Sequence, residues 1–309
     1  MLSLISRSLC IALLVLTAVA CGGASGPPSA DGSRLNVVAT TTQVADFAAN
    51  IGGDKVRVHG LLKPNVDPHD YEPTPLDMRM LAEADVVVKN GVGFEKWLDQ
   101  AIEASGFRGT LVDASQGVRL RTGEGASADP HIWHDPRNAK TMAANIARAF
   151  AAADAANAAV YEQNLAAYQA RLDELDAEIE KKIQSIPEDR RKLVTDHDTF
   201  GYYADRYGLT VVGSVIPSFD TSAELSAKQI TDLVARIKAA GVTAIFSEAS
   251  LPPKTAEAIG REAGVRVVAG EDALYGDSLG PEGSAGATYL QMMRHNTDTI
   301  VAALGGAAT

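Results

Sequence analysis

Short apolar runs alternate with segments of helical periodicity along most of the chain, in two successive series. Apolar runs of this length are typical of strands buried on both faces, and helical segments between them indicate parallel βα units. The first series has apolar runs at 34–41, 55–62, 85–90 and 110–115, with helical patterns at 43–51, 75–84 and 94–104. The second has apolar runs at 192–196, 210–216, 244–249 and 265–270, with helical patterns at 199–208 and 227–241 and another before the last run. The pattern predicts an α/β fold of two lobes, each a small parallel sheet flanked by helices.

A long helix is predicted between the two series. Apolar residues recur there every three or four positions, which gives one apolar stripe. The stripe consists of Tyr161, Leu165, Tyr168, Leu172, Leu175, Ile179, Ile183 and Ile186. Asp154 is a suitable N-cap and Pro187 a stop, and some thirty residues give a helix of roughly 45 Å. We expect this helix to pack along both lobes rather than project as a coiled-coil arm. The predicted division is an N-terminal lobe at 35–153, a connecting helix at 154–187 and a C-terminal lobe at 188–309.

The first twenty residues have the features of a cleaved leader. Arg7 precedes a short apolar run from Leu9 to Ala20, too short for a membrane-spanning helix of the mature protein. The run ends in "LTAVAC", which resembles a bacterial lipoprotein signal, although Ala18 stands at the usual leucine position. We therefore expect a signal peptide at 1–20, a lipid on Cys21 and a flexible Gly/Ser/Pro-rich tether at 21–34. The alternative is a soluble secreted protein in which Cys21 has no role.

Charge and cysteine content narrow the classes of function. The net charge is -11 and there is no basic stripe, so nucleic-acid binding is not expected. The only cysteines, Cys10 and Cys21, both belong to the leader region. The folded part therefore has no disulfide and no thiolate ligand, and any metal site in it must use histidine and carboxylate groups.

Three histidines and one aspartate follow predicted strands of both series: His69, His131, His197 and Asp277. Open α/β sheets bind their ligands beyond the carboxyl ends of the strands, so a cleft between the lobes would bring these residues together. Three imidazoles and a carboxylate suit a borderline divalent ion. Prolines at 64, 68, 73 and 75 stiffen the loop around His69, which lowers the entropy lost on binding.

Each of these histidines also has a simpler interpretation, because a lone loop histidine is more often a surface or hydrogen-bonding group. His134 lies three residues after His131, and we expect it to support a ligand or line the rim rather than bind the ion. Glu72 and Glu248 are further candidates for groups that orient a ligand histidine. His59 and His295 are assigned no role in the site.

Five ordered segments carry a family resemblance: "DPHDYEPTPLDMRMLAEADVVVKNGVGFEKWL", "DPHIWHDPRNA", "VTDHDTFGYYADRYGL", "AIFSEAS" and "LYGDSLGPEGSAGATYLQMMRHN". From about Leu35 onward the chain is similar to the metal-binding solute-binding lipoproteins of bacterial ABC importers for zinc and manganese. The resemblance implies two lobes joined by one long helix, with the metal between them on His69, His131, His197 and Asp277. It also implies a monomer, lipid-anchored on the outer face of the cytoplasmic membrane, that serves an ABC permease there.

The metal expected from the sequence is Zn²⁺, with Mn²⁺ as the alternative. Manganese members of the family usually carry a carboxylate at the third ligand position, where this chain has His197. Zinc also binds a given N/O site more tightly than manganese. The segment "RTGEGASADPH" lacks the long His-rich loop of many zinc members, which leaves manganese open. A second departure, "ELS" at 224–226 in place of the family's Glu-Pro-Ser, is expected to affect only the start of a helix.

A zinc-dependent hydrolase is the rival from another class. A catalytic zinc keeps an open coordination position and a nearby base, whereas four protein ligands fill the coordination sphere. The chain has no HExxH, and Glu72 or Glu248 would have to act as the base. We therefore do not expect an enzyme. Binding of a metal chelate would instead require a site too open to coordinate a bare ion.

Overall fold

The computed structural model describes residues 34–122 and 127–305. The predicted signal peptide at 1–20, Cys21 and all of the predicted tether except Arg34 lie outside the described residues. Nothing in the described part of the chain is a helix both long enough and apolar enough to span a membrane.

The first apolar series forms a parallel sheet of four strands in the order β2-β1-β3-β4. Its strands are β1(Leu35–Ala39), β2(Val56–Gly60), β3(Val86–Lys89) and β4(Thr110–Asp113), and its helices are α1(Thr42–Gly52), α2(Pro75–Glu83) and α3(Leu98–Ser105). Residues 86–88 of β3 are fully buried, as expected for a strand covered on both faces. The predicted helix at 94–104 begins later, at Leu98, after turns at 91–97.

The second series repeats this topology, with a parallel sheet in the order β6-β5-β7-β8. Its strands are β5(Lys192–His197), β6(Thr210–Ile216), β7(Ala244–Phe246) and β8(Arg266–Val268), and its helices are α6(Gly201–Tyr207), α7(Ala227–Ala240), α8(Lys254–Ala263) and α9(Tyr289–Leu304). In both sheets the chain crosses from one side of the first strand to the other, which creates a switch point beside β1 and beside β5. The predicted α/β architecture of two parallel sheets is confirmed.

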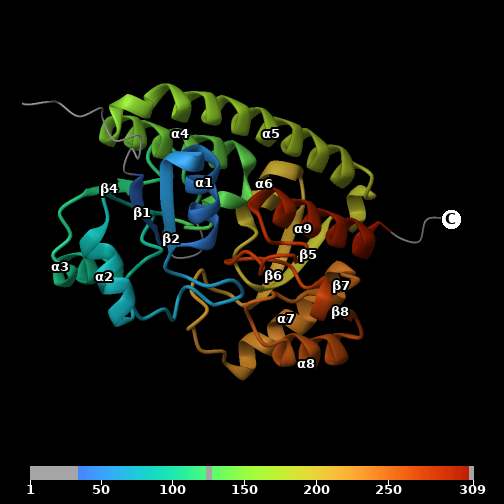
Figure 1. Cartoon of the computed structure of the whole chain (residues 1–309). Helices are drawn as coiled ribbons and strands as arrows, with labels where there is room; N and C mark the ends of the chain where they lie inside the picture. Colours follow the sequence, from blue (N-terminus) through green and yellow to red (C-terminus); the bar gives the residue numbers. More distant parts are fainter. Residues whose placement is uncertain (1–33, 123–126, 306–309) are drawn as a thin grey trace, which may run out of the picture. The chain divides into compact units, whose positions relative to one another are not determined.

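The long helix is α5(Ala158–Gln184), which has 27 residues and follows α4(Pro136–Ala153). It packs against α1 and α4 and also against α6 and α9, so it contacts helices from both series (Figure 1). The prediction that it begins at Asp154 is wrong. The Asp154 carboxylate accepts hydrogen bonds from Asn157 and Tyr161, and the 3-10 turn η4(Ala155–Asn157) separates it from the helix.

Asp46 lies where α1 meets α5 and α9, and its carboxylate has no cationic ion-pair partner within 4 Å among the described residues. Tyr168, Asn50 and the backbone N–H of Tyr289 donate hydrogen bonds to it, but burial dominates and raises its pKa to about 6. Because the pKa of Asp46 is higher in the folded state, its protonated carboxyl contributes to stability below the unfolded-state pKa. That contribution is lost as the pH rises through 6.

Asp46→Asn is therefore expected to raise the free energy of unfolding at pH 7.5 by about 2 kcal/mol and to change it little near pH 4. Urea unfolding of both proteins at the two pH values measures this difference. If Asp46→Asn changed the free energy of unfolding equally at both pH values, the ionised carboxylate of Asp46 would not be what destabilises the fold at pH 7.5.

Candidate metal centre

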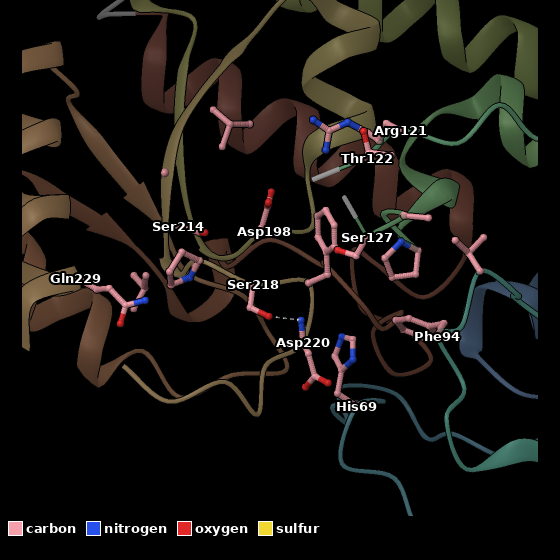
Figure 2. Close-up of a pocket in the computed structure, with 18 of the residues that line it drawn as sticks. His69, Phe94, Arg121, Thr122, Ser127, Asp198, Ser214, Ser218, Asp220 and Gln229 are labelled. Carbon is pink, nitrogen blue, oxygen red and sulfur yellow. Dashed lines mark hydrogen bonds between the residues drawn. The ribbon is translucent and has the colours of Figure 1, made fainter. Parts of the chain in front are cut away.

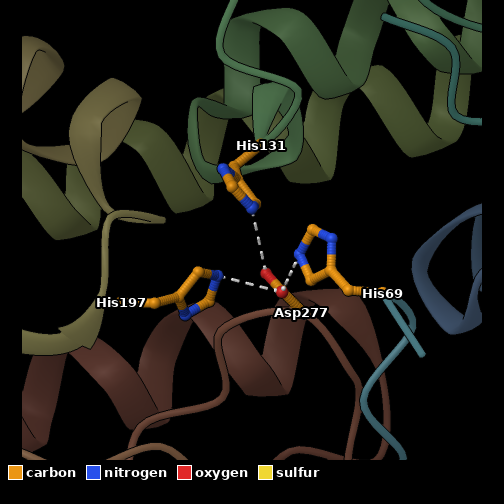
Figure 3. A group of neighbouring side chains, drawn as sticks. All are labelled: His69, His131, His197 and Asp277. Atoms are coloured by element: carbon orange, nitrogen blue, oxygen red, sulfur yellow. Dashed lines mark hydrogen bonds and ion pairs between the residues drawn. The ribbon is translucent and has the colours of Figure 1, made fainter. Parts of the chain in front are cut away.

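The four residues singled out in the sequence lie together in the structure. One ligand atom from each of His69, His131, His197 and Asp277 lies within 4.8 Å of the other three. Asp277 is central in Figure 3: its Oδ2 is 3.0 Å from Nε2 of both His69 and His197, and its Oδ1 is 3.4 Å from His131 Nε2. His69 follows β2, His131 precedes the turn η3(Ile132–His134), His197 ends β5, and Asp277 lies on the loop before α9.

The cluster is buried. His131 and His197 have no exposed surface, Asp277 is 2% exposed, and the side chain of His69 is 4% exposed. Burial alone would raise the pKa of Asp277, but His197 and His131 hold it well below its usual range. Burial alone would lower the pKa of His197, but Asp277 and Glu248 raise it well above its usual value. A buried carboxylate among three imidazoles is an environment suited to a cation.

Two of the imidazoles are oriented in the same way by a carboxylate. The Nδ1 atoms of His131 and His197 lie 2.8 Å from Asp129 Oδ1 and Glu248 Oε1. Each carboxylate oxygen also accepts the backbone N–H of its histidine at 3.0 Å. Since a carboxylate oxygen only accepts, both rings carry hydrogen on Nδ1, and their Nε2 atoms are the ones that face the centre. Neither Nε2 has a well-aligned hydrogen-bond partner among the described residues, although Asp277 is close.

Arg121, in the first half of the fold, supports the Asp129–His131 pair and joins it to α6 in the second half. Arg121 Nη1 lies 2.8 Å from Asp129 Oδ2, and its Nε lies 2.9 Å from Asp205 Oδ2 on α6. The Tyr202 hydroxyl, also on α6, donates to the backbone oxygen of Asp129. Burial would raise the pKa of Asp129, but His131 and Arg121 lower it, so the carboxylate stays ionised. The sequence alone did not identify Arg121, because its link to the second half of the fold, through Asp205 and Tyr202, spans some eighty residues.

The His69 loop is fixed at both ends. Asp67 accepts the backbone N–H of His69, and the Tyr71 hydroxyl donates to Asp77 at 2.7 Å. Thr74 and Asp77 form a capping box that starts α2 directly after the loop. Asn65 donates its backbone N–H to Leu279 O and Ser278 Oγ, which ties this loop to the Asp277 loop.

The Asp277 loop is held against the end of β7. Leu274 exchanges backbone hydrogen bonds with Ser247 and Ala249, on either side of Glu248. The close approach requires glycine at position 276, where an added Cβ would lie 2.1 Å from Glu248 Oε2. The chain thereby brings a carboxylate from the last loop to the switch point beside β5.

The three candidates for supporting roles differ in where they lie. Glu248 contacts His197 as described above. His134 is fully buried, and this burial lowers the pKa of its imidazole to about 3, so the ring is neutral. Glu72 is exposed, and no hydrogen bond or ion pair joins it to the four residues within the described part of the chain. The expectation for Glu72 is wrong, because the loop turns Asp67 rather than Glu72 toward the second half of the fold, where Asp67 accepts from Thr221.

A cleft of about 1370 Å³ leads to the edge of the cluster at His69 (Figure 2). Phe94 and Pro130 line it from the first half of the fold, and Ser218, Phe219 and Asp220 line it from the second. Lys96 forms an ion pair with Asp220 across its mouth, and Thr221 donates to Asp67 at 2.6 Å. His69 is thus the ligand candidate nearest to solvent.

Comparison with known proteins identifies the family. Residues 37–303 match the model described as the zinc-uptake complex component A, periplasmic. The chain belongs to this family of metal-binding solute-binding proteins of ABC transporters. The predicted family is confirmed.

Relatives named for different metals are about equally similar in sequence to this chain. A manganese ABC transporter substrate-binding lipoprotein of Streptococcus anginosus is 33% identical over 303 residues, covering 94% of this chain and 96% of that protein. A zinc-binding protein of Treponema pallidum is 36% identical over 304 residues, covering 95% and 96%. An iron ABC transporter substrate-binding lipoprotein of Streptococcus pyogenes is 32% identical over 298 residues, covering 93% and 94%.

Solved structures agree with the fold. The periplasmic zinc-binding protein from Treponema pallidum superimposes with a TM-score of 0.80 at 33% identity, covering 87% of this chain and 98% of that one. The family is a solute-binding transporter component, which is not an enzyme, whereas the metal differs among its members.

Proposed function

We propose that the mature protein binds one Zn²⁺ through His69, His131, His197 and Asp277 and delivers it to an ABC permease. The observation that supports this most is the convergence of three Nε2 atoms on one buried carboxylate, with two of the imidazoles fixed as acceptors toward the centre. Tetrahedral zinc at about 2.0–2.1 Å puts its ligand atoms about 3.4 Å apart, so shifts of roughly 1 Å gather the four around an ion. Lipidation at Cys21, as the names of several relatives suggest, would hold the protein at the outer face of the cytoplasmic membrane.

Manganese is the second candidate, because relatives with manganese in their names match the chain along nearly all of its length. Three imidazoles and a single carboxylate favour zinc, whereas manganese favours oxygen ligands and higher coordination numbers. Calorimetric titration of metal-free protein with each ion tests the preference. Nanomolar affinity for manganese with micromolar affinity for zinc would overturn the zinc assignment.

A zinc-dependent hydrolase receives less support. The fourth group at the centre is Asp277, which leaves little room for the water that a catalytic zinc retains. Glu248 is hydrogen-bonded to His197, and exposed Glu72 forms no hydrogen bond or ion pair with the four residues in the described part of the chain, so neither is placed as a base. Zinc-dependent hydrolysis of peptides or esters that is lost in Asp277→Ala would revive this alternative.

Release is proposed to begin with the His69 loop. Because α5 packs on helices from both halves, wide separation of the lobes would break a continuous apolar interface. His69 instead lies on a loop at the cleft, held across its mouth by the Lys96–Asp220 and Asp67–Thr221 contacts. A local shift of this loop would remove one ligand without unpacking the helices.

Zinc affinity is expected to fall as the pH decreases from 8 to 5. His197 has a pKa well above its ordinary value, because Asp277 and Glu248 outweigh burial, so a proton competes with the ion there. Each imidazole that must lose a proton weakens binding by about tenfold per pH unit below its pKa. Competition with a chelator of known protonation constants measures the slope. A flat profile over this range would exclude imidazole ligands.

A further inference from the structure

His134 takes part in a hydrogen-bonded chain that reaches Asp277. Its Nε2 lies 3.3 Å from the hydroxyl oxygen of Thr199, and that hydroxyl lies 3.0 Å from Asp277 Oδ1. All three side chains are buried, with Asp277 the most exposed at 2%. The imidazole of His134 also packs on Phe200, with ring centroids 4.5 Å apart. His134 and Thr199 are not among the residues that line the solvent-facing cleft at His69.

The direction of the protons in this chain follows from its chemistry. The hydroxyl of Thr199 has one hydrogen, and an ionised carboxylate can only accept, so this hydrogen is donated to Asp277 Oδ1. The Thr199 oxygen then accepts from His134, which places the ring hydrogen of the neutral imidazole on Nε2. His134 Nδ1 carries the lone pair and has no donor among the described residues. The opposite tautomer would leave a buried N–H unsatisfied, which costs more.

This arrangement treats the two oxygens of Asp277 differently. Oδ2 is 3.0 Å from Nε2 of both His69 and His197, whereas Oδ1 is engaged by Thr199. Oδ1 is nevertheless only 3.4 Å from His131 Nε2, so both oxygens are within reach of an ion at the centre. If one oxygen of Asp277 binds the ion, the protein fills four coordination positions. If both oxygens bind, it fills five.

We propose that His134 and Thr199 are positioning residues that restrict Asp277 to one ligand oxygen and thereby favour four-coordinate zinc over manganese. The proposal rests on the proposed function, since it assumes that the four residues bind the ion. Hydrogen bonds to a ligand carboxylate fix its orientation, and zinc accepts four ligands where manganese prefers more oxygen atoms. His134 thus acts on the ion through Thr199 and Asp277 without contacting it.

Paired substitutions isolate the hydrogen bonds from the packing. Thr199→Val removes the hydroxyl at nearly constant shape, and Thr199→Ser retains it. His134→Leu removes the donor, and His134→Gln retains an N–H at a similar distance from the backbone. The measurements are the dissociation constants for Zn²⁺ and Mn²⁺ and the visible spectrum of the Co²⁺-loaded protein. Ligand-field bands of cobalt weaken as the coordination number rises from four to five.

Thr199→Val and His134→Leu are each expected to weaken zinc binding by about tenfold and to weaken manganese binding less, so that the preference for zinc narrows. The cobalt bands lose intensity in both variants. Thr199→Ser and His134→Gln retain most of the wild-type preference. The double variant Thr199→Val/His134→Leu is expected to match Thr199→Val alone, because both changes break one chain.

An unchanged ratio of zinc to manganese affinity in folded Thr199→Val, with an unchanged cobalt spectrum, would overturn the proposal. Additive effects of the two substitutions would also overturn it, because they would place His134 outside the chain. The Thr199 pair decides the outcome even if His134→Leu does not fold. Failure of the proposed function would look different, since the wild-type protein would then bind neither ion saturably.

Discussion

Asp277→Ala is expected to weaken zinc binding by roughly a hundredfold to a thousandfold. Zinc bound by four protein ligands releases about 10–16 kcal/mol, so each ligand accounts for roughly 2.5–4 kcal/mol. Asp277 also lies nearest to all three imidazoles and supplies the only negative charge among the four residues. Without it, three buried imidazoles would have to hold a divalent cation in a site with no carboxylate ligand. Competition titration against a zinc chelator measures the loss.

Asp272→Ala is the matched control, because Asp272 is an exposed aspartate on the same segment of the chain, in η6(Gly270–Asp272). It is expected to bind zinc as the wild type does. Circular dichroism of metal-free Asp277→Ala should show an intact fold. Wild-type zinc affinity in folded Asp277→Ala would remove Asp277 from the ligand set.

Trp133→Ala is expected to lower the free energy of unfolding of the metal-free protein by about 3–5 kcal/mol. Trp133 is fully buried, and its ring packs against Phe94 with centroids 5.3 Å apart. Its indole N–H donates to Gly276 O, and its backbone oxygen accepts from the Tyr289 hydroxyl at 2.6 Å. The side chain therefore joins the first half of the fold to the Asp277 loop. Urea unfolding measures the change, and zinc titration is expected to show weaker binding as well.

Leu172→Ala is the control that lowers the stability of the fold without changing the metal site. Leu172 is fully buried on α5, away from the four residues, and its truncation is expected to cost about 2–5 kcal/mol. Its zinc affinity should equal that of the wild type. The proposed link through Gly276 is wrong if Trp133→Ala lowers the free energy of unfolding by less than about 1 kcal/mol. It is also wrong if Trp133→Ala and Leu172→Ala weaken zinc binding equally.

The strands and the four central residues could be predicted because their determinants are local. Each buried strand is a short run of apolar residues; His197 ends such a strand, and His69 lies on the loop that follows another. Parallel strands place their carboxyl ends on one edge, so sequence position alone indicates that these side chains approach one another. The apolar stripe of α5 is likewise visible in the sequence, since its period is that of a helix.

The roles of the neighbouring polar groups could not be predicted, because they depend on contacts between distant segments. Glu72 and Glu248 both lie close in sequence to segments of the site, yet only Glu248 contacts a ligand histidine, His197, fifty-one residues away along the chain. Arg121 reaches Asp205 on α6 only once the two halves have packed. The start of α5 was missed for a local reason: the Asp154 carboxylate accepts hydrogen bonds from the side chains of Asn157 and Tyr161, and the 3-10 turn η4 precedes the helix.

The central claim is that one divalent ion is bound by three imidazoles and one carboxylate contributed by four distant segments. A crystal structure of the zinc-loaded protein, with anomalous data collected on both sides of the zinc absorption edge, tests it most directly. We expect one strong anomalous peak, about 2.0–2.2 Å from Nε2 of His69, His131 and His197 and from an oxygen of Asp277. A peak elsewhere, or a peak that lacks two or more of these ligands, would contradict it.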